Sequence, residues 1–238
     1  MTTTDLKPNT SRLLPRALLA FGALVALTAS SQAAILAAWD DFGSGLSADN
    51  TLTGFSGTIA GVSLDSGNFG SNDGTFGTIA GAISDGDGVF VRNTTTALTL
   101  TITNNTGAAY NIESLHFDFG HRGTNTPSTF DVTYTSGGLG PSSTLIDNID
   151  VGGVAPGDVG DFTDFDYTLS SLLSDIVLDD GESAVFTFNN FVNRTGTSSS
   201  AATMDNFLIQ GTAVPEPSSV ALVGLAGAAL LLRRRRNR

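Results

Sequence analysis

The sequence contains no cysteine. A disulfide framework, a cysteine-ligated zinc site and a thiol nucleophile are therefore excluded. The region between the two ends of the chain, about 180 residues, is long enough to bury a single hydrophobic core without such cross-links. This length predicts one domain there.

Positive charge is scarce in the same central region. Residues 34–212 contain no lysine and three arginines against 21 acidic residues, a formal charge of −18. The net charge of the whole chain is only −12, because the two ends carry most of the cations. A phosphate backbone would be repelled, which excludes nucleic-acid binding. The excess of carboxylates favours solubility and would attract Ca²⁺ outside a cell.

Residues 1–33 have the order of a secretion signal peptide. Three basic residues precede an apolar run over residues 17–29, and the small residues Ser31 and Ala33 follow it. Thirteen residues of helix rise only about 20 Å, against about 30 Å of membrane hydrocarbon, so this segment is too short for a permanent span. We expect signal peptidase to cut after Ala33, leaving a mature chain that starts at Ala34.

The C-terminus carries a second short apolar run, over residues 220–232, preceded by Pro215, Glu216 and Pro217. Five arginines follow this run: Arg233, Arg234, Arg235, Arg236 and Arg238. Positive charge beside a membrane segment stays in the cytoplasm, so the rest of the chain lies on the far side. A 13-residue helix is short for a lasting anchor, which predicts transient attachment to the membrane.

A Pro-Glu-Pro stretch, a short apolar helix and an arginine cluster, in that order, resemble the PEP-CTERM sorting signal. The resemblance covers residues 213–238 and implies recognition by exosortase, a membrane-embedded enzyme that resembles cysteine transpeptidases. It implies a bacterial protein sorted to the cell surface or the extracellular matrix, in organisms that make exopolysaccharide and biofilm. Such a motif identifies an address and not an activity.

Short runs of alternating apolar and polar residues fill the region 34–212, which we take as one domain. Period two places one set of side chains in a core and the other in water, as in strands. Strands are predicted at 35–42, 89–92, 98–102, 115–119, 130–134, 163–169, 184–188 and 203–210, and a helix only at 170–178. Many short strands separated by turns predict an all-β fold, a two-sheet antiparallel β-sandwich with jelly-roll topology. The signal helix and the short C-terminal membrane helix would flank it.

The alternation also predicts which side chains are buried. The expected core residues are Leu100, Ile102, Phe117, Phe130, Val132, Phe186 and Phe188. On the opposite face of one strand, His116 and Asp118 would face water, with His121 in the following turn. No third ligand and no serine in a nucleophile elbow accompany these residues. The sequence therefore predicts no catalytic site and no enzyme.

The last predicted strand, Met204 to Ile209, resembles the closing strand of jelly-roll carbohydrate-binding modules. In several such families an aspartate at this position helps to hold a structural Ca²⁺, with ligands from the first strand. The resemblance implies Asp205, with Asp40 and Asp41, as candidate Ca²⁺ ligands. Trp39 is the only tryptophan, so aromatic platforms for sugars are few.

Three hypotheses about function follow. The first is a non-catalytic exported protein of the cell surface or matrix, associated with exopolysaccharide. The second is a carbohydrate-binding module, which exposed aromatic pairs would favour. The third is a secreted glycan-active hydrolase, which two facing carboxylates in a cleft would favour.

Overall fold

A computed structural model divides the chain into two compact units, Met1–Gln32 and Ala33–Arg238. It describes residues 32–65, 70–71, 75–76, 79–80, 87–122, 126–151, 162–193 and 201–215, and the following account concerns these residues. The predicted signal helix and C-terminal membrane helix lie outside them. Within the described ranges, no helix has the length and hydropathy needed to cross a membrane.

The larger sheet, called sheet A, has the strand order β12-β9-β15-β1-β2, and every pair in it is antiparallel. Three shorter strands extend it: β13 pairs with β9, β7 pairs with β15, and β4 pairs with β7. The bounds are β1 Ala34–Trp39, β2 Asn50–Thr51, β4 Ser63–Asp65, β7 Gly88–Val91, β9 Tyr110–His121, β12 Phe162–Thr168, β13 Val177–Leu178 and β15 Ala202–Ala213.

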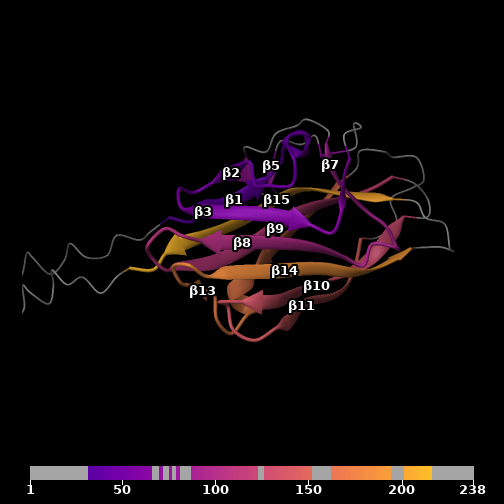
Figure 1. Cartoon of the computed structure of the whole chain (residues 1–238). Coiled ribbons are helices and arrows are strands. Elements are labelled where there is room, and N and C mark those ends of the chain that lie inside the picture. Colours follow the sequence, from indigo (N-terminus) through magenta and orange to yellow (C-terminus); the bar gives the residue numbers. More distant parts are fainter. Residues whose placement is uncertain are drawn as a thin grey trace, which may run out of the picture. The chain divides into compact units, whose positions relative to one another are not determined.

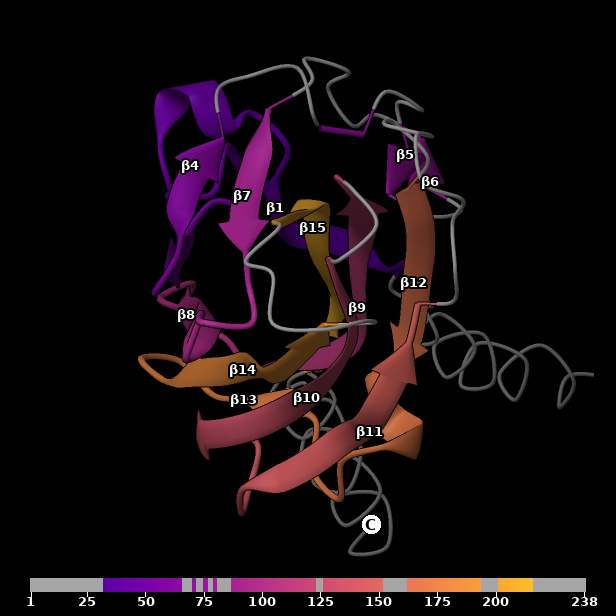
Figure 2. The ribbon, with the colours of Figure 1, turned by 90° about the vertical axis from the view of Figure 1, so that its right-hand side faces the viewer.

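The second sheet, called sheet B, has the order β11-β10-β14-β8-β3 and is also antiparallel. Its strands are β3 Phe55–Ala60, β8 Ala97–Asn104, β10 Pro127–Gly137, β11 Ser143–Asp150 and β14 Ser183–Asn193. A separate hairpin pairs β5 (Thr75–Phe76) with β6 (Ile79–Ala80). Figures 1 and 2 show sheets A and B as two layers, with β14, β10 and β11 on one side and β15 and β9 on the other. The prediction of an all-β, two-sheet fold is confirmed.

The hydrophobic core fills the space between these two sheets. All seven predicted core residues are buried, from Leu100 on β8 to Phe188 on β14. Phe117 lies at the centre of an aromatic group and contacts five rings: Phe130, Phe165, Tyr167, Phe188 and Phe207. These rings come from both sheets, so their contacts hold the layers together.

One prediction about secondary structure is wrong. Residues 170–178 form no α-helix: a 3₁₀ turn covers Leu169–Ser171, and Val177–Leu178 adds the short strand β13 to the edge of sheet A. The helix-like spacing of apolar residues in this segment has another cause. Leu169 and Leu173 both pack on the core, but they do so from a tight turn. Two strands of sheet B, β3 and β11, were not among the predicted strands.

Candidate functional site

A row of polar side chains crosses the outer face of sheet A on three neighbouring strands. Ser114 and His116 are two residues apart on β9, so their side chains share a face. Asp166 on β12 is in register with His116, and Gln210 on β15 is in register with Ser114. The pairing of strands therefore assembles residues that are far apart in the sequence.

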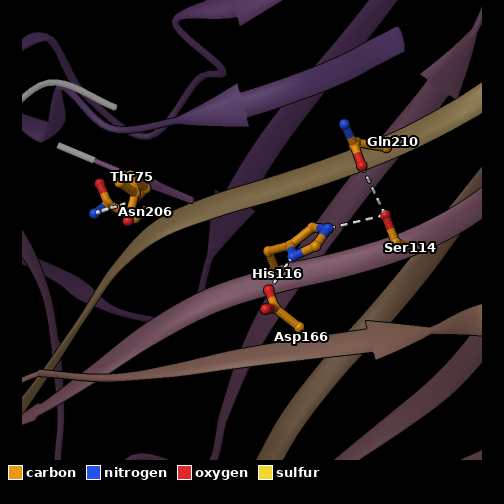
Figure 3. A network of polar contacts seen from close by, with 6 residues as sticks. All are labelled: Thr75, Ser114, His116, Asp166, Asn206 and Gln210. Atoms are coloured by element: carbon orange, nitrogen blue, oxygen red, sulfur yellow. Dashed lines mark hydrogen bonds and ion pairs between the residues drawn. The ribbon is translucent and has the colours of Figure 1, made fainter. Parts of the chain in front are cut away.

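These four side chains form one chain of hydrogen bonds (Figure 3). His116 Nδ1 is paired with Asp166 Oδ1, and His116 Nε2 lies 2.9 Å from Ser114 Oγ. Ser114 Oγ in turn donates to Gln210 Oε1 at 3.3 Å. The order of carboxylate, imidazole and hydroxyl is that of an orienting acid, a general base and a nucleophile.

Two features of this array argue against acyl-transfer chemistry. An oxyanion hole needs backbone N–H groups aimed at the reacting oxygen. Ser114 and His116 lie in mid-strand, where β9 pairs with β12 on one side and β15 on the other, so their backbone groups belong to the two ladders. In addition, the Ser114 hydroxyl donates to Gln210, and it has no second proton to give to His116. The array acts as a polar tie across three strands.

A second polar cluster lies further along β9 and β15, at a β-bulge. The bulge separates Asp205 from Leu208 in the pairing with β9, and Asn206 adopts a positive φ of 47° there, which asparagine tolerates better than most residues. Asn206 Nδ2 donates to Asp118 Oδ2 at 2.8 Å and to the Thr75 carbonyl at 3.0 Å. Its Oδ1 is buried and has no hydrogen-bond partner.

The residues of this cluster are enclosed. Asp118 and Asp205 face each other in register and are 1% and 0% exposed. Asp205 accepts hydrogen bonds from the backbone N–H groups of Ser71 (2.6 Å) and Asn206 (2.7 Å). The prediction that His116 and Asp118 face water is therefore wrong, since they are 6% and 1% exposed. Ser71 and Thr75 bond to Asp205 and Asn206 on this face, and Phe76 packs against Leu208, the residue opposite His116.

The predicted Ca²⁺ ligands lie at one corner of the same sheet. Strands β1 and β15 are neighbours, with Trp39 opposite Phe207; Asp205 lies on β15, and Asp40 directly follows β1. The backbone N–H groups of Asp40 and Asp41 both donate to Asp49 Oδ2, at 3.2 and 3.0 Å. No three Asp, Glu or His side chains in the described ranges are grouped so that they could hold one metal ion. The Ca²⁺ site stays a prediction.

Most of the predicted processing residues lie outside the described ranges: Ser31, Glu216, Pro217 and Arg233 to Arg236. Ala33 is exposed, one residue before β1. At the other end, Val214 still donates its N–H to the Ala109 carbonyl at 2.9 Å, and Pro215 is exposed. The sheet thus ends where the Pro-Glu-Pro stretch begins.

A family model for the PEP-CTERM protein-sorting motif matches residues 213–236. The chain carries this sorting motif. This match confirms the resemblance to the PEP-CTERM sorting signal. Such a motif marks an exported protein that an exosortase processes. The match covers a tenth of the chain and says nothing about the domain before it.

Comparison with curated proteins finds no match. Among solved structures, the chain is similar to TmCBM61 in complex with β-1,4-galactotriose, at 11% identity and a TM-score of 0.35, covering 71% of this chain and 92% of that one. It is also similar to a family 11 carbohydrate-binding module from Clostridium thermocellum, at 14% identity and a TM-score of 0.33, covering 74% and 96%.

A third similar structure is the enzymatically active domain of tailspike protein 4 from bacteriophage CBA120, at 16% identity and a TM-score of 0.33. The alignment covers 68% of this chain but only 20% of the tailspike chain. At such identities and TM-scores, none of these likenesses indicates what the chain binds or does.

Sequence reasoning missed Ser114, Asp166, Asn206 and Gln210 as members of polar clusters. Alternation alone places Ser114 and Asp166 on the outward faces of their strands. Any polar residue exposed to solvent would have the same placement, so the pattern does not mark them as members of a cluster. What brings them together is the register of β12 and β15 on β9, and a register cannot be read from one strand's own pattern.

Proposed function

We propose that the chain is a non-catalytic exported protein of the bacterial cell surface or extracellular matrix, associated with exopolysaccharide and biofilm. The sorting motif at residues 213–236 carries this proposal. Signal peptidase removes residues 1–33, and the apolar run 220–232 holds the chain in the membrane only until exosortase acts. Residues 34–212 are then the delivered domain, with the formal charge of −18 that keeps it soluble.

We further propose that this domain is a jelly roll. The strand orders β1-β15-β9-β12 and β8-β14-β10-β11 support it, because most consecutive long strands lie in opposite sheets. The first and last strands, β1 and β15, are neighbours in the same sheet. This arrangement places the start of β1 beside the end of β15, with Ala34 opposite Gly211.

A host strain without exosortase tests the sorting proposal. We expect the protein to accumulate in the membrane fraction of that strain, and at the cell surface or in the matrix of the parent strain. The physical reason is that the apolar run and the arginines remain attached when no enzyme acts on them. An identical distribution in the two strains would refute sorting by exosortase.

The absence of catalysis is tested at Ser114. We expect no labelling of Ser114 by a fluorophosphonate probe and no ester hydrolysis above background, because the hydroxyl faces no oxyanion hole. Ser114→Ala serves as the matched control, since it removes the hydroxyl and leaves His116 and Asp166 in place. Labelling of the exported protein that Ser114→Ala abolishes would show that the array is a nucleophilic site.

The positions of tryptophan and tyrosine do not support the second hypothesis, a carbohydrate-binding module that stacks sugars on exposed aromatic rings. Trp39 and Tyr134 are fully buried, and Tyr110 and Tyr167 are half-buried. Their rings pack in the core and are not spread on a face where a sugar could stack. Association with polysaccharide would have to use other chemistry.

A structural Ca²⁺ remains part of the proposal. Ca²⁺ accepts backbone and amide oxygens beside carboxylates, so a group of three acidic side chains is not required. Asp205, the unpartnered Asn206 Oδ1 and the neighbouring Asp40 and Asp41 support a site at this corner. An ion bound only by the folded state would stabilise it by about 2.7 kcal/mol at a hundred times the dissociation constant.

Thermal melts test this site. We expect millimolar Ca²⁺ to raise the midpoint more than Mg²⁺ or NaCl of equal ionic strength, since screening alone treats these salts alike. Asp205→Ala and the nearly isosteric Asp205→Asn should both remove the difference between Ca²⁺ and Mg²⁺, whatever they do to the midpoint itself. Equal midpoints in all three salts would show that no such site exists.

A further inference from the structure

The last strand of the domain, β15, stays paired with β9 up to the residue before the Pro-Glu-Pro stretch. Ala213 is opposite Tyr110, and the Val214 N–H donates to the Ala109 carbonyl at 2.9 Å. Pro215, the first residue of the sorting stretch, is exposed and directly follows this bond. The sheet and the sorting stretch are thus adjacent in the sequence, with no linker between them.

We call residues 212–214 the terminal segment, because among the described residues only one neighbouring strand holds them. The pairing of β15 with β1 reaches no further than Gly211, which is opposite Ala34. Beyond Gly211, the described partners lie on the β9 side alone. One side-chain bond adds to that pairing, since Thr212 Oγ1 donates to Glu113 Oε1 at 2.6 Å. Both side chains are half-buried, so water replaces the bond when the segment opens.

The turn that the terminal segment binds is held more firmly than the segment itself. Asn104 is fully buried, and its Nδ2 donates to the Ala108 carbonyl at 2.8 Å and to the Leu178 carbonyl at 2.9 Å. Thr106 Oγ1 donates to Asn104 Oδ1 at 2.8 Å in the same turn. These bonds fix the chain just before Ala109, so local opening at this edge moves the terminal segment and not its partner.

The chain between the terminal segment and the apolar run is short. Five residues, 215–219, lie between Val214 and the run at 220–232. Even fully extended, five residues span at most about 18 Å. While the apolar run is in the membrane, the end of β15 is held within that distance of it, and an enzyme has to bind the sorting stretch inside this gap.

An extended peptide binds a partner through main-chain hydrogen bonds, in the manner of an added strand. The Val214 N–H has one proton to donate, and the Ala109 carbonyl already accepts it. We propose that the terminal segment must separate from β9 before exosortase can act, and that the bonds of Thr212 and Val214 set how often it does so. This inference rests on the proposed processing by exosortase and names its regulation: the fold of the substrate limits the rate at which the tail is removed.

A reversible cross-link tests the requirement for opening. Ala213 and Tyr110 form the pair next to the hydrogen-bonded pair of Val214 and Ala109, and the two kinds of pair alternate in antiparallel sheets. Their Cα atoms are therefore expected about 4.5 Å apart, a distance that a disulfide spans. The chain has no cysteine of its own, so Ala213→Cys with Tyr110→Cys can form only one intramolecular disulfide.

We expect the cross-linked variant to stay in the membrane fraction with its arginine tail, as measured by intact mass. Each single cysteine variant should be processed like the parent chain. A Gly-Ser linker of about six residues between Val214 and Pro215 should restore processing of the cross-linked variant, because it supplies free chain to the enzyme. A linker that fails to restore processing would show that the cross-link acts in another way and would refute the regulation.

Thr212→Val removes the bond to Glu113 with little change in shape and should have the opposite effect. In unprocessed protein from the strain without exosortase, we expect the Val214 amide to exchange with deuterium about tenfold faster, as for the loss of one hydrogen bond. Tail removal in the parent strain should also become faster. Thr212→Ser keeps the hydroxyl and is the matched control. Equal amide exchange and equal tail removal in these two variants would contradict the role given to the Thr212 bond.

The parent chain distinguishes failure of this inference from failure of the proposed function. A parent chain that keeps its tail in a host with exosortase would overturn the proposed processing, and the regulation with it. A parent chain that is processed no faster than the cross-linked variant would overturn the regulation alone, and processing by exosortase would stand.

Discussion

Replacing Phe117 with aspartate is expected to abolish folding of the β-domain. Phe117 is 1% exposed and touches five aromatic rings from both sheets, so no water can reach a charge placed there. An unpaired carboxylate in such a core costs several kcal/mol, and the lost ring contacts add about 3–5 kcal/mol. Native domains are stable by only about 5–15 kcal/mol in total.

Far-UV circular dichroism and thermal melts check this result. Phe117→Leu keeps the position apolar and should fold with a lowered midpoint, which separates loss of volume from burial of charge. Thr144→Asp on β11 adds the same carboxylate at an exposed position and should stay within about 0.5 kcal/mol of the parent chain. A Phe117→Asp variant that melts like the parent would contradict the assignment of the core.

The alternation of apolar and polar residues was sufficient to predict the core. In β8, and in β14 over residues 183–188, buried residues alternate with half-buried ones, as period two requires. Leu100, Ile102, Phe186 and Phe188 were assigned to the core on this pattern alone, and they are fully buried. The pattern works here because the outer face of sheet B carries small threonines that remain in contact with water.

The same reasoning failed on the outer face of sheet A. His116 and Asp118 alternate correctly with Leu115 and Phe117, yet they are buried as well. Ser71 and Thr75, about 40 positions away in the sequence, lie over this face and bond to Asp205 and Asn206. A strand's own period says which side chains share a face, but not whether a distant segment lies over that face.

The polar clusters depended on register in the same way. The bond between Asp166 and His116 exists because β12 pairs with β9 so that these two residues are opposite each other. A shift by one residue would place Asp166 on the other face of the sheet. The resemblance to carbohydrate-binding modules implied Asp205, Asp40 and Asp41 as Ca²⁺ candidates. Asp205 lies on β15 and Asp40 and Asp41 directly follow its neighbour β1, but the resemblance could not supply the liganding geometry.

Replacing Pro215, Glu216 and Pro217 with alanine is expected to block processing of the C-terminal tail. Proline disfavours a helix that would continue through this stretch, and alanine would remove that restriction. The protein should then stay in the membrane fraction with its arginines attached. Ser218→Ala with Ser219→Ala is the matched control in the same tail and should be processed normally. Normal processing of the triple alanine variant would contradict a role for this stretch.

The intact mass of the protein isolated from the surface of its native host tests the central claim most directly. We expect a mass that lacks residues 1–33 and also lacks Arg233 to Arg238, because signal peptidase and exosortase act at the two ends. The matching fragment map should begin at Ala34 and end near Pro215. A mass that includes Met1 or the arginine cluster would contradict the account of an exported, exosortase-processed surface protein.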